Sequence, residues 1–352
     1  MKGMVIWAHS KCRSTFGLYR EVVRQSPVPV KLVFGKGVLE QRIEQGFSEE
    51  EFEGVPSEVI GDDRDSARRV LSETLGWTHV VCAYQVSTVF QWVMSRAKAR
   101  GDRVVVYSEA PCEMCLGVKA LLKRLYYRFI LPRKLRTVVR CADIILNQSG
   151  MMGIDRLLRL GWTRERILPF GYASPRLTSK DEFHSAIKTL DRSSLRVLHL
   201  GNETPYRGVS VLDRAVDLAL RRGIKIKLQK TAGRLPQDEL VQAIRAADVV
   251  VGCGFCEPWG LRINDAVQEG VPVVVSDGMG VSYLVEQEGC GLVVPKGDPK
   301  ALANALERCA KDGDFLARLT VCTKQAAVNW SPASRAAVFL DVVLPRVSDM
   351  RS

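Results

Sequence analysis

Residues 249–280 read VVVGCGFCEPWGLRINDAVQEGVPVVVSDGMG, a succession of strand, loop, helix, strand and loop. The valines at 249–251 predict a buried strand, and Gly260 opens a helix over 261–269. A second buried strand follows at 271–275. This order is typical of a parallel α/β sheet, in which ligands bind at the carboxyl ends of the strands. Both loops lie at that edge, so we expect a binding site there.

The helix that begins after Gly260 suits a diphosphate, because a helix N-terminus presents unpaired N–H groups and a partial positive charge. Glu257 precedes this helix, and Asp265 lies about two helical turns later on roughly the same face. Carboxylates accept hydrogen bonds from hydroxyls, so a sugar or a ribose is the expected partner. The alternative is that Glu257 stabilises the helix N-terminus and Asp265 is a solvated surface acid.

The run EPWGLRIND followed by AVQEGVPVVVSDGMG resembles the E-x7-E signature of retaining GT-B glycosyltransferases of family 4. The resemblance implies an α/β fold of the GT-B type, with two Rossmann-like domains whose parallel sheets face each other across a cleft. It implies that Glu257 faces the donor sugar and that the backbone after Gly260 holds the donor diphosphate. The second family glutamate, which holds the ribose, falls on Asp265, one methylene shorter.

Residues 195–201, LRVLHLG, predict the first strand of the second domain. Family members follow this strand with an arginine and then with Lys-Gly, and both bases hold the diphosphate. Here Asn202 replaces the first base, and Arg207 stands for the second. Arg207 can pair bidentately with phosphate oxygens, and the alternative is a surface arginine near a helix start. The expected donor-binding residues are Arg207, Gly201, Asn202, Pro258, Trp259, Gly260, Leu261 and Asp265.

The N-terminal half predicts strands at 4–8, 30–34, 78–83 and 104–107, and the resemblance adds strands near 144 and 167. Many family members carry a His-Asp-like pair after the fourth strand, and Ser108 and Glu109 stand there. Glu109 is therefore the acceptor-side catalytic candidate, as a general base or a hydroxyl anchor. The alternative is an acid that caps the next helix. His9 and Ser10, in an expected loop over 9–14, are further acceptor-side candidates with Ser108, and His9 has capping or packing as its alternative.

Residues 119–140 contain eight bases and no acid, interleaved with leucines and aromatic residues, and Pro132 is expected to divide them into two helices. A basic amphipathic segment with aromatics is typical of a membrane-surface contact, where each base adds about 1 kcal/mol near an anionic leaflet. A solvated basic face and a nucleic-acid site are the alternatives, and no nucleic-acid motif accompanies the segment. The expected membrane contacts are Lys119, Lys123, Arg124, Arg128, Arg133 and Lys134.

The chain has 352 residues, a net charge of +12 and ten cysteines. The charge predicts an anionic partner, and no apolar run approaches the ~20 residues of a membrane span. The sequence starts without a signal-peptide pattern, so we expect reduced thiols and a cytoplasmic protein. The two CxxC pairs, at 112–115 and 253–256, lie in different domains, so no metal site is expected from them.

With the resemblance, these patterns give an expected acceptor domain at 1–173, a linker at 174–193 and a donor domain at 194–330. The resemblance also implies that a helix within 331–352 crosses back onto the first domain. The expected activity is retaining, hexosyltransferase-type transfer from a nucleotide diphosphate-sugar to a lipid-linked saccharide in O-antigen or capsule biosynthesis. We expect the protein to lie on the inner face of the cell membrane, without a cofactor or catalytic metal. A non-catalytic GT-B scaffold at the membrane is the alternative.

Overall fold

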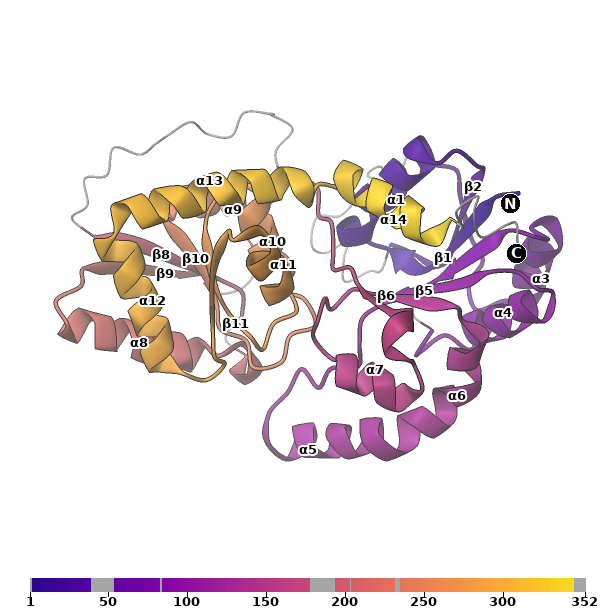
Figure 1. Ribbon diagram of the computed structural model, residues 1–352, viewed down its shortest axis with the longest axis horizontal. Coiled ribbons are helices and arrows are strands. Elements are labelled where there is room, and N and C mark those ends of the chain that lie inside the picture. Colours follow the sequence, from indigo (N-terminus) through magenta and orange to yellow (C-terminus); the bar gives the residue numbers. More distant parts are fainter. Residues whose placement is uncertain are drawn as a thin grey trace.

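Two parallel sheets organise the chain, one in each half of the sequence (Figure 1). The computed structural model describes residues 2–38, 54–82, 84–177, 194–202, 204–231 and 235–344, with the side chain of Arg13 excepted. The first sheet has seven strands in the order β3-β2-β1-β4-β5-β6-β7. Its strands are β1 Met4–Lys11, β2 Val30–Val38, β3 Ser57–Val59, β4 Thr78–Val81, β5 Val104–Ser108, β6 Ile144–Asn147 and β7 Ile167–Pro169.

The second sheet has five strands in the order β12-β11-β10-β8-β9. Its strands are β8 Leu195–Leu200, β9 Ile226–Thr231, β10 Val249–Gly252, β11 Val273–Ser276 and β12 Gly291–Val294. The valine runs of β10 and β11 are fully buried because helices cover both faces of a parallel sheet. The helices of this half are η4 Pro205–Arg207, α8 Val209–Arg221, α9 Gln237–Ala246, α10 Leu261–Gln268, α11 Ser282–Glu288, α12 Pro299–Lys311 and α13 Gly313–Asn329.

The first sheet also packs on both faces, and its strands alternate between two apolar clusters. Val5 and Trp7 belong to one cluster, and Met4, Ile6 and Ala8 belong to the other. The helices of this half are α1 Arg13–Gln25, α3 Arg64–Glu73, α4 Thr88–Ala99, α5 Gly117–Leu125, η2 Tyr126–Ile130, α6 Leu131–Cys141, α7 Ile154–Leu160 and η3 Arg164–Arg166. The fold is thus α/β with two Rossmann-like halves.

The last helix, α14 (Pro332–Val343), leaves the C-terminal half and lies beside α1 in the N-terminal half (Figure 1). Phe339 and Val343 are fully buried in the same cluster as Ile6. Arg335 donates to the carbonyl oxygen of Phe170 at 2.9 Å. The N-terminal core is therefore completed by the end of the chain.

Several expected boundaries were wrong. Strand β1 continues to Lys11 by pairing with β2, so His9 and Ser10 lie in a strand rather than in a loop over 9–14. Ser57–Val59 pairs with β2 as a polar edge strand that the sequence analysis did not predict. Residues 48–53, and most of the expected linker at 174–193, lie outside the described residues. Helices α3 and α13 were not predicted.

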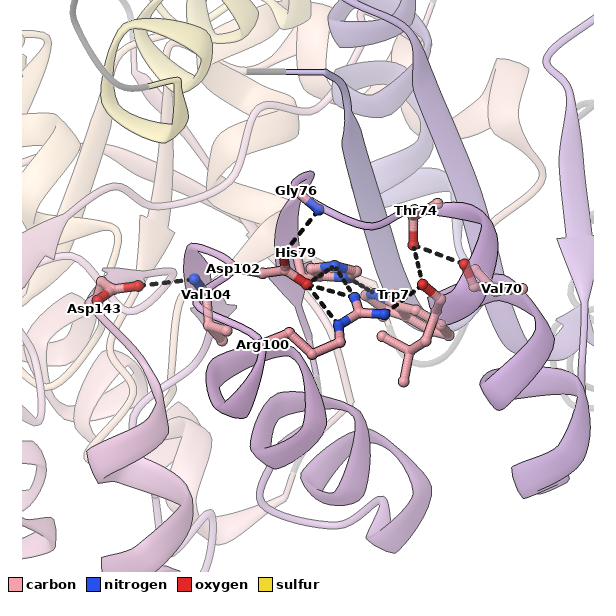
Figure 2. Close-up of polar contacts among 10 residues, drawn as sticks. Trp7, Val70, Thr74, Gly76, His79, Arg100, Asp102, Val104 and Asp143 are labelled. Atoms are coloured by element: carbon pink, nitrogen blue, oxygen red, sulfur yellow. Dashed lines mark hydrogen bonds and ion pairs between the residues drawn. The ribbon is translucent and has the colours of Figure 1, made fainter. Parts of the chain in front are cut away.

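A buried polar network lies at the start of strands β4 and β5, at the edge opposite the expected site (Figure 2). Trp7 Nε1 donates to His79 Nδ1 at 3.1 Å, so His79 Nε2 carries the proton and faces Asp102 Oδ2 at 3.4 Å. Arg100 pairs with Asp102 and donates to the carbonyl oxygen of Leu71. Burial lowers the pKa of His79 to about 4, so the network is built on a neutral imidazole.

Candidate active site

A small pocket lies at the carboxyl ends of β8 and β10, where the sequence placed the donor site. His199 enters it from β8 and Arg207 from η4, while Glu257 and Gly260 come from the loop between β10 and α10. Gly260 has φ +111° and precedes α10, and a Cβ there would lie 2.6 Å from the terminal methyl of Met279. Glycine therefore brings the start of α10 close to the pocket without a steric clash.

Arg207 and Glu257 face each other across this pocket. Arg207 Nη2 lies 3.8 Å from Glu257 Oε1, and both side chains are mostly buried. Burial raises the pKa of Glu257, and the positive charge of Arg207 opposes that rise. A Cβ on Gly201 would overlap the Arg207 guanidinium, so the glycine at the end of the first strand makes room for this base. The pocket thus holds Arg207 and Glu257 face to face beside a helix N-terminus, with Arg262 as a second cation in its lining.

His199 is a pocket residue that the sequence analysis did not select. It is 3% exposed, and its Nδ1 lies 3.0 Å from the carbonyl oxygen of Val251. Because a carbonyl can only accept, Nδ1 carries the proton, and Nε2 is an acceptor without a partner among the described residues. Burial and the charge of Arg207 lower the pKa of His199. A polar residue near the end of an apolar strand was the signal that could have found it.

Glu109 lies in the N-terminal half, directly after β5, and is half-buried. Its Oε1 accepts a hydrogen bond from the Tyr172 hydroxyl at 2.8 Å. Burial raises the pKa of Glu109, the Tyr172 bond opposes this, and the negative charge of Glu257 adds to it. The charge of the donor-side carboxyl therefore contributes to the pKa of the acceptor-side one, although the two come from different domains.

Comparison with known proteins covers both halves of the chain. Residues 175–326 match the family model described as glycosyl transferases group 1. The C-terminal domain belongs to this family. Two solved structures share the whole fold. The first is HepE of Anabaena in complex with UDP, with a TM-score of 0.62 and 15% identity, and the match covers 97% of this chain and 99% of HepE. The second is the lipopolysaccharide outer core galactosyltransferase WaaB, with a TM-score of 0.64 and 10% identity, and the match covers 97% of this chain and 99% of WaaB. The complete chain therefore has the GT-B fold.

The glycosyl transferases group 1 domain is also similar to curated relatives. The D-inositol 3-phosphate glycosyltransferase of Nocardia farcinica is 31% identical over 148 residues, which is 42% of this chain and 32% of the relative. The enzyme of the same name from Rhodococcus opacus is 30% identical over 204 residues, 57% of this chain and 45% of the relative. The chain thus matches less than half the length of these relatives.

Not every expected donor residue of the group 1 domain reaches the pocket. Arg207, Glu257 and Gly260 line it, whereas Trp259 is 1% exposed and stacks on Trp330 in the core. Asp265 is buried on α10, and its Oδ2 lies 3.3 Å from Nη1 of the pocket residue Arg262. The pocket lining does not include Gly201, Asn202, Pro258 or Leu261.

The acceptor-side candidates are distributed more widely in the GT-B fold. Ser108 is buried at the end of β5, next to Glu109. His9 is half-buried, and burial lowers its pKa with a further contribution from Lys36 on β2. Ser10 pairs with Lys36 in the sheet. Ser108 and Glu109 therefore lie together at the end of β5, whereas His9 and Ser10 lie on β1 next to strand β2.

The basic segment forms α5, a π-helical turn η2 and α6, with Pro132 in the first turn of α6. Figure 1 shows α5 at an outer edge of the N-terminal domain, on the side away from α13 and α14. Ala120 is the single buried residue of α5. The bases Lys119, Lys123, Arg124, Arg128, Arg133 and Lys134 are exposed, and so are Met114, Leu116, Val118, Leu121, Leu122, Leu125, Phe129 and Ile130.

Sequence reasoning identified these bases but did not predict that the apolar residues between them would also be exposed. Monomeric soluble proteins rarely expose contiguous apolar patches of this kind unless the patch binds something. In the part of the chain that the structure describes, no helix has the length and hydrophobicity that crossing a bilayer requires. We call residues 114–134 the basic-apolar face.

Proposed function

We propose that this protein is a retaining glycosyltransferase that moves a sugar from a nucleotide diphosphate-sugar to an acceptor held by the N-terminal domain. The Arg207–Glu257 pair beside the start of α10 is the observation that carries the proposal. It combines a diphosphate-binding cation with an acceptor for sugar hydroxyls in one pocket. HepE of Anabaena, which has the same fold, was crystallised with UDP and with UDP-glucose.

Donor binding would rearrange this pair. The diphosphate attracts Arg207, whose guanidinium can bind two phosphate oxygens at once, and the backbone N–H groups at the start of α10 add further donors. Glu257 then loses its cation and accepts hydrogen bonds from the donor sugar. His199 Nε2 lines the pocket and has no partner among the residues that the structure describes, so it is a second site for a hydroxyl. Asp265, beside Arg262, is the candidate for the ribose hydroxyls.

In the transfer step, the bond from the anomeric carbon to the diphosphate oxygen breaks, and a bond from the acceptor oxygen forms on the same face. Arg207 and the α10 N-terminus stabilise the charge that develops on the leaving diphosphate. The acceptor proton leaves to the departing phosphate oxygen or to the carboxylate of Glu109. The Tyr172 hydroxyl fixes the position of that carboxylate.

We further propose that the acceptor is a lipid-linked saccharide and that the basic-apolar face binds the inner face of an anionic membrane. Its leucines and Phe129 supply area for burial among lipid acyl chains, and its lysines and arginines match anionic headgroups. A lipid-linked acceptor would reach the N-terminal domain from such a surface. Polysaccharide assembly of the O-antigen or capsule type is the corresponding process.

A thermal-shift panel of UDP, GDP, ADP, CMP and their sugars tests the donor site. A ligand at ~100 times its dissociation constant stabilises the folded state by about 2.7 kcal/mol. We expect one nucleotide diphosphate to raise the transition temperature of the wild type and of the control variant Arg222→Ala. Arg222 directly follows α8 and pairs with Glu307. Arg207→Ala should lose that shift. The absence of any shift in the wild type would favour the non-catalytic scaffold, to which the replacement of a base by Asn202 also points.

Vesicle binding tests the membrane contact. The protein should co-sediment with anionic phospholipid vesicles, less so as the salt concentration rises, and it should not co-sediment with phosphatidylcholine vesicles. Leu122→Glu should reduce this binding, whereas Val321→Glu, which changes an equally exposed residue on α13, should leave it intact. Equal losses in the two variants would contradict the assignment of this face. The anomeric configuration of the product, determined by NMR, tests retention.

A further inference from the structure

Two cysteines from different domains meet beside the candidate active site. Cys112 follows β5 in the N-terminal domain, and Cys256 lies between β10 and α10, immediately before Glu257. Their Sγ atoms are 2.8 Å apart although the residues are 144 positions apart in the sequence. Each cysteine belongs to a CxxC motif, and the sequence analysis treated these motifs as separate. The fold brings one thiol of each motif together.

Charged groups surround the two thiols. Glu113 Oε2 accepts from the Cys256 thiol at 3.0 Å, and Arg156 Nη2 on α7 lies 3.0 and 2.7 Å from the two carboxylate oxygens of Glu113. The contact with Cys112 lowers the pKa of Cys256 to about 6, although burial and the carboxylate of Glu113 oppose this, and the same contact raises the pKa of Cys112. Both cysteines are partly exposed. Two thiols in contact, one of them with a lowered pKa, are therefore within reach of small molecules.

We propose that Cys112 and Cys256 form a reversible disulfide that fastens the two domains together next to Glu257. A disulfide bond length is about 2.05 Å, so the sulfur atoms need to approach by less than 1 Å. Cys112, Glu113 and Cys256 also offer three ligand atoms within 4.8 Å of one another. A tetrahedral zinc ion with Zn–S distances of about 2.3 Å needs its sulfur ligands roughly 3.7 Å apart. Arg156 already occupies both oxygens of Glu113, so the geometry favours the disulfide over a metal site.

The oxidant is a small-molecule disulfide of the glutathione class. Cys256 loses its proton to solvent, and the resulting thiolate attacks one sulfur of the oxidant, forms a mixed disulfide and expels one reduced thiolate. Cys112 then loses its proton to solvent and attacks Cys256 Sγ, which expels the second reduced thiolate. One protein disulfide forms, and one oxidant molecule is reduced to two thiols. A reducing thiol reverses both steps.

The consequence for the site follows from the position of the link. A covalent bond between the loop after β5 and the loop before α10 prevents the domains from separating at this edge of the cleft. This inference rests on the proposed function: the oxidised protein should exchange its nucleotide diphosphate more slowly than the reduced protein. The link would thus make sugar transfer sensitive to the thiol–disulfide balance around the protein.

Oxidation of the full-length reduced protein with oxidised glutathione tests the proposal. We expect loss of two of the ten free thiols and a linked peptide containing Cys112 and Cys256 in tryptic digests made without reductant. The association rate of UDP, measured by stopped flow, should fall at least tenfold and recover with dithiothreitol. Cys112→Ser should show neither change, and Cys115→Ser, altered three residues away, should behave as the wild type.

Three outcomes would overturn the proposal. The first is the absence of a linked peptide, and the second is a linked peptide with an unchanged UDP association rate. The third is one zinc ion per chain that Cys112→Ser removes, which would identify a metal site instead. A reduced wild type that does not bind UDP would count against the proposed donor, whereas the linked peptide would still report on the thiol pair.

Discussion

Replacing Gly208 with alanine tests how closely the two loops of the donor pocket pack. Gly208 has φ +71°, and a Cβ there would lie well inside 3.0 Å of the carbonyl oxygen of Cys253. A left-handed backbone costs an L-residue roughly 1–2 kcal/mol. The carbonyl cannot move alone, because Phe255 N–H donates to the Tyr206 carbonyl oxygen at 2.7 Å, and loss of that bond costs roughly 1 kcal/mol more.

We therefore expect Gly208→Ala to lower the free energy of unfolding by about 2–3 kcal/mol. It should also weaken UDP binding at least tenfold, because Arg207 moves with its neighbour. Gly223→Ala is the matched control. Gly223 follows the other end of α8 with φ +80°, and a Cβ there would meet nothing within 4 Å. Gly223→Ala should lower the free energy of unfolding only by the cost of the backbone strain and should leave the affinity for UDP unchanged.

Urea unfolding followed by circular dichroism gives the two free energies, and calorimetric titration gives the two UDP affinities. Equal destabilisation by the two alanines, with UDP affinity retained in both, would refute the close approach of the loops.

Three further predictions concern other parts of the molecule. Tyr172→Phe removes the hydrogen bond that lowers the Glu109 pKa, so the acidic limb of the pH–rate profile of sugar transfer should move to higher pH, and an unmoved limb would argue against Glu109. His79 has its pKa lowered to about 4 from 6.5. The unfolded state therefore binds more protons between these values, and the free energy of unfolding should fall by about 3 kcal/mol as pH falls through that window. His79→Gln should remove this component from urea titrations, and an identical pH dependence in the variant would contradict it. Trp259→Ala should cost about 3–5 kcal/mol in the same assay because the side chain is fully buried, well above the cost of half-buried Trp92→Ala.

The C-terminal domain was predictable because its signals are local. The apolar runs of β8, β10 and β11 each end at a glycine or within two residues of one, and α10 begins directly after Gly260. Helix α12 begins at Pro299, directly after Asp298, whose side chain accepts from the N–H groups of Lys300 and Ala301. Each of these features depends on residues within one or two turns of each other, so one sequence suffices to find them.

Features that depend on distant contacts were not predictable in this way. In the sequence His199 is only one residue of a buried strand. Its tautomer is fixed by the Val251 carbonyl oxygen of β10, which is distant in the sequence. The meeting of Cys112 and Cys256 requires both domains to be docked. Strand β3 is polar because it is an edge strand with one neighbour, so its residues lack the hydrophobic signal of a central strand.

The position of α14 has a consequence for the order in which the protein can fold as it is synthesised. All strands of the N-terminal sheet have been synthesised after β7, but Phe339 and Val343, which cover one apolar face of that sheet, have not. Elongation from β7 to α14 takes about 10–30 s at ~5–20 residues per second. During that interval the nascent N-terminal domain exposes a large apolar surface. A chaperone that binds nascent apolar surface would therefore bind the first domain until α14 has been synthesised.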